Sequence, residues 1–357
     1  MSDTCAQSIY LWGDNMVDII IENDKKLPKL DLNVTNRCNF RCAHCAFDSG
    51  IWNLCEFSLD KIREILQDTK DLGGTKIDIT GGEPLMREDV ADIMRIAKGL
   101  GYKVELVTNG SLLTDKKLKL FKEIGLDSIA ISLDGSDYET YNIVRKVPIK
   151  IYETVLRNIR LAVENGFDLK INTLACQENY RDIPNIAEFC LRSGIKEQGI
   201  YYFTPVGRGV RDGLHAVEPR TWLDFIRKRL MKYDNMGDKT KMKMSLEVPM
   251  IEKGRIKKEI RCIADSERYH LQILPDGNVY PCAILASYIR PIANLNKVSV
   301  KDIWQNKALW EDYWHQLSDI RKRCRGHCVD FSGFDIGNMK GYDLVCPLRK
   351  YTPYEVG

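Results

Sequence analysis

The sequence lacks any long apolar stretch and any large excess of charge of one sign. No run approaches the roughly 18 uninterrupted apolar residues of a membrane-spanning helix, and the N-terminus lacks the basic and apolar regions of a secretory signal peptide. Lysine and arginine total 53 against 50 aspartate and glutamate residues, so the net charge of +3 does not predict a nucleic-acid partner and does not exclude one. We therefore expect a cytoplasmic protein that has no membrane partner.

Internal repeats and low-complexity tracts are also lacking. The 357 residues are 44% hydrophobic and 29% charged, which is typical of globular proteins and excludes disordered, collagen-like and coiled-coil classes. This length predicts one large domain with a smaller appendage.

Cysteine, in contrast, is abundant, with 12 residues in the chain. Reducing compartments do not keep structural disulfides, so the way in which these cysteines are grouped along the chain is the main indication of their function. The tightest group is Cys38, Cys42 and Cys45, and a looser group lies in the last 100 residues. The cysteines that we expect to be unpaired are Cys5, Cys55, Cys176 and Cys190.

From about residue 30, apolar runs alternate with amphipathic segments that are joined by short links, which predicts a β/α series. The six expected strands cover residues 30–34, 75–79, 103–107, 127–132, 168–173 and 199–203. Right-handed crossovers make such a sheet parallel, either doubly wound or curled into a barrel. The chemistry then gathers at the C-terminal ends of the strands, where four unusual loops lie, at residues 36–45, 81–84, 108–110 and 132–135.

The cysteine triplet follows the first predicted strand and fits within eight residues. Three thiolates so placed can turn toward one point and hold a soft metal centre. With three local cysteines, a [4Fe-4S] cluster keeps one iron open for another ligand. The alternatives are three buried thiols, or a zinc site that uses His44 as its fourth ligand.

The segment NRCNFRCAHC has the CxxxCxxC pattern and resembles the radical S-adenosylmethionine (radical SAM) enzymes. The segments ITGGEP (79–84), TNG (108–110) and SLDG (132–135) resemble the loops that follow in that family. The resemblance covers residues 30 to about 210 and implies a partial (β/α)6 barrel with a [4Fe-4S] cluster on Cys38, Cys42 and Cys45. It implies that SAM binds the fourth iron and is cleaved reductively to a 5′-deoxyadenosyl radical, which abstracts hydrogen from a substrate. Ferredoxin or flavodoxin is the expected reductant.

The resemblance also implies roles in SAM binding for residues near these loops. Gly81 and Gly82 would let the backbone approach the SAM amino group, and Glu83 would offer a carboxylate to that ammonium. His44 occupies a position that is usually aromatic in the family, so it either lies against the adenine or faces solvent.

Three further polar residues are candidates for SAM contacts, two of them at strand ends. Asn109 and Ser132 could reach the ribose or the SAM carboxylate, and Arg145 could pair with the carboxylate. Each could instead satisfy the hydrogen bonds of its own loop. In the segment FTPVGRG (203–209), Arg208 either binds substrate or SAM, or faces water.

The spacing of Cys262, Gly277 and Cys282 resembles the opening of the SPASM and twitch extensions found on some radical SAM enzymes. A hairpin turn at residues 275–277 would return Cys282 to the side of Cys262. Cys324, Cys328 and Cys346 could then complete one auxiliary [4Fe-4S] cluster, although the same thiolates could bind structural zinc. Further cysteines of a full SPASM domain are absent, so we expect a small, cysteine-rich α+β domain of the twitch type. Its cluster would serve the substrate side of the barrel mouth.

The expected organisation is an N-terminal extension (1–29), a radical SAM partial barrel (30–218), a helix with a basic connector (219–260) and an auxiliary-cluster domain (261–357). The connector lysines would meet either an anionic substrate or solvent. The leading prediction is a radical SAM oxidoreductase that modifies a small molecule or cofactor precursor in biosynthesis. A maturase for peptide or protein side chains is the alternative, which the short N-terminal extension disfavours. A non-catalytic iron-sulfur or zinc scaffold is the alternative of another class.

Overall fold

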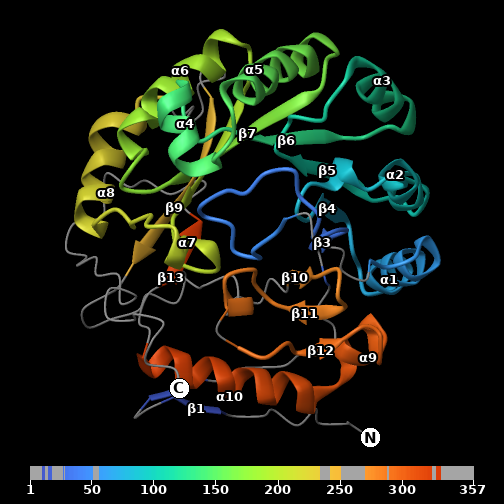
Figure 1. Ribbon diagram of the computed structural model, residues 1–357. Coiled ribbons are helices and arrows are strands. Elements are labelled where there is room, and N and C mark those ends of the chain that lie inside the picture. Colours follow the sequence, from blue (N-terminus) through green and yellow to red (C-terminus); the bar gives the residue numbers. More distant parts are fainter. Residues whose placement is uncertain are drawn as a thin grey trace, which may run out of the picture.

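The computed structural model contains one large sheet with helices packed around it (Figure 1). It describes residues 10–12, 15–17, 27, 29–50, 56–233, 242–250, 270–287, 289–323 and 327–330. The sheet strands are β3 (Lys29–Asn33), β4 (Lys76–Thr80), β5 (Lys103–Thr108), β6 (Ser128–Ser132), β7 (Asp168–Ala175), β8 (Glu197–Tyr202), β9 (Lys243–Met250), β10 (His270–Ile273), β11 (Asn278–Tyr280), β12 (Ala293–Asn294) and β13 (His327–Asp330). Their order is β12-β11-β10-β3-β4-β5-β6-β7-β8-β9-β13. A separate two-stranded sheet pairs β1 (Tyr10–Trp12) with β2 (Asn15–Val17).

The six strands β3 to β8 are parallel and adjacent in chain order, as the β/α pattern predicts. The helices between them are α1 (Leu59–Asp71), α2 (Val90–Gly99), α3 (Asp115–Ile124), α4 (Tyr138–Arg145), α5 (Ile149–Glu164) and α6 (Ile183–Arg192). In Figure 1 the strands form an arc, and α1, α2, α3, α5 and α6 lie on its outer side. A curved parallel sheet covered by helices on the outside is a partial barrel, so the predicted fold class is confirmed.

The boundaries of two helices follow from local sequence signals. Ser58 accepts a hydrogen bond from the Lys61 N–H and caps α1, and Thr114 accepts one from the Lys117 N–H and caps α3. Gly125 ends α3 with a φ of 81°, a left-handed conformation that glycine adopts at low cost. These local signals fix where α1 and α3 begin on the outer side of the barrel.

The strands alternate between an apolar outer face and a polar inner face. In β3, Leu30 and Leu32 are buried in the core, whereas Asp31 between them points to the other side of the sheet. Asp31 is aligned with Asp78 of β4, which is aligned with Glu105 of β5. Lysines such as Lys29, whose Nζ lies 2.7 Å from Asp78, neutralise this acidic row, so the concave wall is polar and charged.

Residues 219–260 were expected to form a helix and a basic connector. The structure confirms a helix, α8 (Pro219–Phe225), which continues into a π-helical turn over Ile226–Leu230. The connector interpretation is wrong for Lys243–Met250, which forms β9, a seventh parallel strand beside β8. Met244 and Leu246 alternate with polar residues and are buried on one face, a strand pattern that the neighbouring lysines obscure in the sequence.

The C-terminal segment joins both edges of the partial barrel. The predicted hairpin is confirmed as β10 and β11, and β10 pairs in parallel with β3. At the other edge, β13 pairs antiparallel with β9. Helices α9 (Val300–Gln305) and α10 (Lys307–Arg323) lie between these strands in the chain, and Asn306 separates them.

The packing of these last helices is aromatic. The rings of Trp304 and Trp310 meet edge to face with centroids 5.8 Å apart, and Trp310 meets Tyr313 in the same way.

Among the described residues, no helix is long and apolar enough to cross a membrane.

Candidate radical SAM site

The cysteine triplet lies on one closed loop after β3, which we call the cysteine loop (residues 34–50). The Cys38 N–H donates to the Gly50 carbonyl at 2.6 Å, and the Gly50 N–H donates to the Asn36 carbonyl at 3.2 Å. Cys38 and Cys42 are buried, whereas Cys45 is partly exposed. In Figure 1 the loop lies within the arc of strands, where the chemistry of such barrels gathers.

Each of the three sulfur atoms has its own hydrogen-bond donor. The N–H of Phe40 donates to Cys38 Sγ at 3.4 Å, and the N–H of Ser49 donates to Cys45 Sγ at 3.3 Å. The third donor is a guanidinium, since Arg145 Nη1 lies 3.7 Å from Cys42 Sγ. Such donors stabilise sulfur atoms that carry negative charge, as thiolate ligands do.

The thiols are close enough to influence one another's protonation. Burial raises the pKa of Cys38 to about 12, and the neighbouring Cys42 and Cys45 add to that rise. Burial also raises the pKa of Cys42. Metal binding must therefore displace protons from these thiols, which couples metal affinity to pH.

The described side chains bear on the zinc alternative. Among the described residues, no group of three or more His, Cys, Asp or Glu side chains is placed to hold one metal ion. The [4Fe-4S] cluster on Cys38, Cys42 and Cys45, in which the cysteines would bind different irons, stays a prediction. The geometry therefore gives no support to a zinc site completed by His44.

The loop after β4 is pressed against the cysteine loop. A Cβ on Gly81 would lie 2.4 Å from the Thr35 carbonyl oxygen, and one on Gly82 would lie 2.3 Å from the Arg37 carbonyl oxygen. The N–H groups of Gly82 and Glu83 donate to these same two carbonyls at 2.7 and 2.8 Å. The two glycines are therefore needed where the two loops meet, whereas their approach to the SAM amino group stays a prediction.

Glu83 is completely buried and connects two loops of the site. Its Oε1 accepts hydrogen bonds from Thr108 Oγ1 at 2.6 Å and from the Leu85 N–H at 3.1 Å, and its Oε2 accepts one from the Asn109 N–H at 2.7 Å. Burial raises the pKa of this carboxyl group, although these hydrogen bonds oppose the rise. Glu83 thus braces the loops after β4 and β5, and its contact with the SAM ammonium stays a prediction.

Asn109 and Ser132 differ in the hydrogen bonds that their side chains already make. Asn109 Nδ2 donates to Asn39 Oδ1 at 2.9 Å, and Asn109 Oδ1 accepts from the Ser111 N–H at 2.9 Å, so this side chain ties its loop to the cysteine loop. Ser132 ends β6, is partly exposed and donates no side-chain hydrogen bond to another described residue. Of these two predicted contacts, Ser132 has the hydroxyl that is available to a ligand.

Arg145 lies at the end of α4 and is buried against the site. Its Nε donates to Asp134 Oδ2, and the other oxygen of Asp134 accepts from the Leu174 N–H at 2.7 Å. Asp134 is a site residue that the sequence interpretation did not assign, although its place in SLDG marked it. The pairing of Arg145 with a SAM carboxylate stays a prediction, while its contact with Cys42 places a cation beside that sulfur.

His44 lies within the cysteine loop, and Arg208 contacts this loop from α7, after β8. Burial lowers the pKa of His44 to about 4, so the imidazole is neutral at physiological pH. The Nδ1 atom of His44 is buried without a hydrogen-bond partner among the described residues. Arg208 is only 1% exposed and bonds to the cysteine loop itself, so the alternative that it faces water is wrong, and a contact with substrate or SAM stays a prediction.

The C-terminal cysteines lie only partly within the described residues. Cys262, Cys324 and Cys346 lie outside them, as do Cys5 and Cys55, and for Cys328 the structure describes only the backbone, in β13. The predicted auxiliary ligand set therefore stays a prediction. Cys176 and Cys190 are buried thiols without a disulfide, as predicted, and Cys190 belongs to the core.

Cys282 lies at the opposite end of the barrel from the cysteine loop. His270 of β10 is aligned with Lys29, the first residue of β3, and its Nδ1 lies 3.3 Å from the carbonyl oxygen of Pro281. Cys282 follows Pro281 directly, so it is near the N-terminal end of β3, whereas Cys38 comes after the C-terminal end. Cys282 therefore does not lie at the same end of the barrel as the cysteine loop, because the hairpin runs back along β3, and the role of its cluster toward the substrate stays a prediction.

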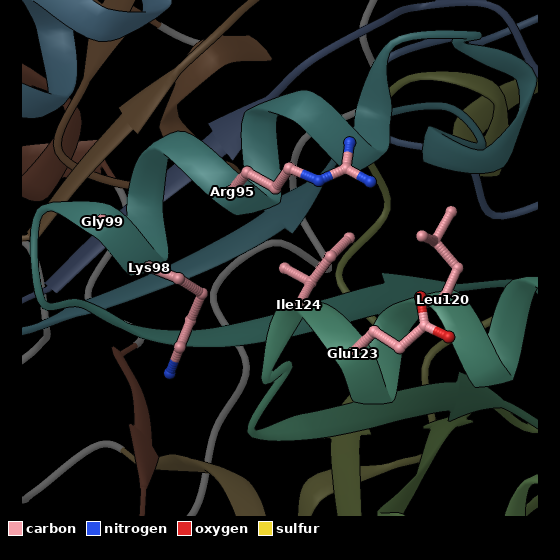
Figure 2. A pocket seen from close by; sticks show the side chains of 6 residues that line it. All are labelled: Arg95, Lys98, Gly99, Leu120, Glu123 and Ile124. Atoms are coloured by element: carbon pink, nitrogen blue, oxygen red, sulfur yellow. The ribbon is translucent and has the colours of Figure 1, made fainter.

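A groove of about 430 Å³ lies outside this site, between α2 and α3 (Figure 2). It is lined by Arg95, Lys98, Gly99, Leu120, Glu123 and Ile124. The C-terminal halves of helices in β/α units lie near the N-terminal ends of the next strands. The groove is therefore on the outer side of the barrel, away from the cysteine loop.

Comparison with known proteins agrees with this geometry. Residues 32–190 match the Radical SAM superfamily model, and residues 262–329 match the SPASM model, described as an iron-sulfur cluster-binding domain. These domains imply SAM and iron-sulfur clusters as cofactors. They cover both cysteine groups that the sequence singled out, apart from Cys346.

Three curated relatives are similar in sequence. The chain is 31% identical over 220 residues to Fe-coproporphyrin III synthase of Methanosarcina barkeri, covering 60% of this chain and 54% of that protein. It is 31% identical over 176 residues to the AdoMet-dependent heme synthase of Nitratidesulfovibrio vulgaris, covering 49% and 48%. The match thus spans about half the length of these two relatives. A probable GTP 3′,8-cyclase of Methanothermobacter marburgensis is 31% identical over 268 residues, covering 73% of this chain and 85% of that protein.

Among solved structures, SuiB of Streptococcus suis bound to S-adenosylmethionine has the same fold, with a TM-score of 0.65 and 17% identity over 81% of this chain and 68% of SuiB. Another SuiB structure, with a TM-score of 0.65, is bound to the precursor peptide SuiA. The names of the sequence relatives are those of enzymes, which excludes the non-catalytic scaffold. With three buried or half-buried thiols on the loop after β3 and a close match to the family over most of a relative's length, this chain belongs to the radical SAM superfamily as an enzyme with a C-terminal SPASM iron-sulfur domain.

Proposed function

We propose that this radical SAM enzyme modifies a small-molecule cofactor precursor by oxidation. The observation that carries the proposal is that the relatives at 29–31% identity are named for coproporphyrin, heme and GTP, all of them small molecules. SuiB, whose name is tied to a precursor peptide, is only 16% identical in that complex, so its likeness concerns the fold alone. The polar concave wall of the barrel also suits a polar small molecule better than an apolar one.

When bound, the reduced cluster and SAM supply a 5′-deoxyadenosyl radical that takes a hydrogen atom from the substrate. The residues that would hold this cluster are Cys38, Cys42 and Cys45. Their three N–H donors stabilise the negative charge on the sulfur atoms. The hydroxyl of Ser132 is the proposed contact to the ribose or the carboxylate of SAM. The neutral ring of His44 is the proposed contact to the adenine.

The proposed task of the C-terminal cysteines is to hold one auxiliary [4Fe-4S] cluster that accepts the electron lost by the substrate. Cys262, Cys282, Cys328 and Cys346 are the proposed ligands, with Cys324 as the substitute for one of them. The position of Cys282 at the far end of β3 supports an acceptor that approaches the substrate from the side opposite to SAM. A small electron carrier such as ferredoxin or flavodoxin is the proposed reductant for the N-terminal cluster.

The test is anaerobic turnover with SAM, a chemical reductant and a panel of candidate substrates. The panel contains iron-loaded and metal-free porphyrin carboxylates, GTP and peptides. We expect a small molecule to raise the yield of 5′-deoxyadenosine and, when deuterated, to transfer deuterium into it. A protein with Cys38, Cys42 and Cys45 replaced by Ala is the control. If deuterium enters 5′-deoxyadenosine only from peptides, the maturase alternative is correct and the small-molecule proposal is wrong.

A further inference from the structure

The loop after β8 (residues 203–209) makes contacts to the cysteine loop that the SAM-binding motifs do not explain. Gly207 has a φ of 53°, and a Cβ there would lie 2.4 Å from the carbonyl oxygens of both Cys45 and Ala46. The N–H of Arg208 donates to the Cys45 carbonyl at 3.0 Å. Figure 1 shows the short helix α7 (Arg208–Arg211) beside the cysteine loop. The two loops are thus in direct backbone contact, although about 160 residues separate them in the chain.

The side chain of Arg208 enters the cysteine loop and bonds to it at three points. Its Nε donates to the Cys42 carbonyl at 2.9 Å. Its Nη1 donates to the Ser49 carbonyl at 2.7 Å and to Asp48 Oδ1 at 2.6 Å. A buried guanidinium is costly unless it is well paired, and its planar fork fits carbonyl and carboxylate groups in fixed directions. Arg208 therefore holds both ends of the segment from Cys42 to Ser49.

Ser49 connects Arg208 to one of the thiols. The carbonyl of Ser49 accepts the hydrogen bond from Arg208, and its N–H donates to Cys45 Sγ at 3.3 Å. Hydrogen bonds to the sulfur ligands are among the factors that set the reduction potential of an iron-sulfur cluster. They favour the reduced state because it carries more negative charge. Ser49 thus connects Arg208, which lies far along the chain, to the sulfur atom of Cys45 and so to the reduction potential of the cluster.

We propose that Arg208 is a positioning residue for the cluster: it fixes Cys42 and Cys45 and maintains the hydrogen bond from Ser49 to the Cys45 sulfur. This role differs from a contact with SAM or substrate, because all three bonding partners of the guanidinium belong to the cysteine loop. The proposal rests on membership of the radical SAM superfamily and not on the identity of the substrate. Loss of such partners of metal ligands typically lowers metal affinity about 10-fold to 100-fold.

The test compares Arg208→Gln with Arg211→Gln in the full chain after anaerobic reconstitution. Arg211 is a matched control because its Nη2 bonds to the other oxygen of Asp48 at 2.7 Å from an exposed position. We expect Arg208→Gln to release iron to a chelator about ten-fold faster than the wild type. The reduced N-terminal cluster, identified by the change of its EPR spectrum on addition of SAM, should show an altered spectrum and a more negative potential. Arg211→Gln should match the wild type in all three measurements.

A folded Arg208→Gln protein with wild-type iron release, EPR spectrum and potential would overturn the proposal. An equal change in Arg211→Gln would also overturn it, because the loss would then come from Asp48 and not from the guanidinium inside the loop. If Arg208→Gln does not fold, Arg208→Lys decides, since lysine keeps the charge but cannot bond to both carbonyls as the fork does. Faster iron release from folded Arg208→Lys supports the proposal, and wild-type behaviour of that variant contradicts it.

Discussion

The two cysteine regions of this protein are built in different ways. Cys38, Cys42 and Cys45 lie on one loop, and the loops after β4 and β8 bond to that loop directly. The C-terminal cysteines are spread from Cys262 to Cys346. Cys282 follows β11, which lies at the β3 edge of the sheet. Cys328 lies in β13, which pairs with β9 at the other edge.

This difference concerns how much of each site the barrel builds before any metal binds. The cysteine loop is held by backbone and buried side-chain hydrogen bonds to neighbouring loops of the barrel, so we expect the barrel to order much of this loop. If the C-terminal cysteines bind one cluster, as proposed, Cys282 after β11 and Cys328 in β13 must be brought together from opposite edges of the sheet. Metal binding and folding are therefore expected to be coupled more strongly at the C-terminal site.

The largest expected effect is the loss of the N-terminal cluster. Replacing Cys38, Cys42 and Cys45 together by Ala should abolish SAM cleavage and lower the iron content from about eight to about four atoms per chain, since each [4Fe-4S] cluster holds four. The fold should persist, because backbone hydrogen bonds that these three side chains do not make hold this loop to its neighbours. Iron analysis, a SAM cleavage assay and circular dichroism measure these outcomes. About four irons together with zinc in the unaltered protein would rule out the auxiliary cluster.

Cys282→Ala should have the next largest effect, confined to the C-terminal region. SAM cleavage should stay detectable, while formation of product from the substrate should be lost or diverted, because the acceptor cluster lacks a ligand. Cys190→Ala, which removes a buried core thiol, is the control for loss of a cysteine as such. Thermal unfolding must accompany the assay, and a normal rate of product formation by folded Cys282→Ala would exclude the acceptor role.

Replacement of Glu83 tests whether this residue of the loop after β4 contacts SAM or only braces the loops. Glu83→Ala should leave the iron content unchanged but weaken SAM binding, and it should destabilise the protein by about 2–4 kcal/mol because three buried donors lose their acceptor. Glu83→Gln keeps an acceptor oxygen but removes the charge. Its NH2 group must face at least one of the three donors, so Glu83→Gln should also destabilise the protein, although less than Glu83→Ala. If Glu83 contacts the SAM ammonium, Glu83→Gln should weaken SAM binding even where the variant is fully folded. If it acts only as a brace, affinity for SAM should fall only together with the melting temperature.

The smallest expected effect concerns the edge where the C-terminal hairpin joins the barrel. His270 Nε2 lies 2.8 Å from Asp31 Oδ2. Burial lowers the pKa of His270, but the charge of Asp31 and its hydrogen bond to the ring outweigh burial in sum and raise the pKa. Lys29 opposes the rise, and the Pro281 carbonyl supports it. The ion pair should therefore stabilise the protein fully below a pH of about 6.5 and lose that contribution, about 1 kcal/mol, as pH rises through the raised pKa. Unfolding measured across pH, with His270→Asn as the control that lacks this dependence, checks the sign.

Local sequence signals predicted much of the fold. The six parallel strands, the caps Ser58 and Thr114, and the hairpin around Gly277 follow from periodicity and turn chemistry that act over a few residues. The spacing of the cysteine triplet and the loops after the strands likewise placed the site at one end of the sheet. The missed strand β9 shows the limit of this approach, because its place depends on pairing with β8 and with β13.

The sequence by itself thus determined the β/α series, the cysteine loop and the family to which the chain belongs. Only the tertiary structure decided what the polar residues of the site bond to. Glu83, chosen from the sequence as a SAM contact, is enclosed by the loops after β4 and β5, and Arg208 bonds to carbonyl groups about 160 residues earlier. The physical reason is that a charged side chain reveals its chemistry in the sequence, whereas its partners are set by which loops the curvature of the sheet brings together. The same packing places Cys282 at the far end of β3, which no spacing of cysteines could reveal.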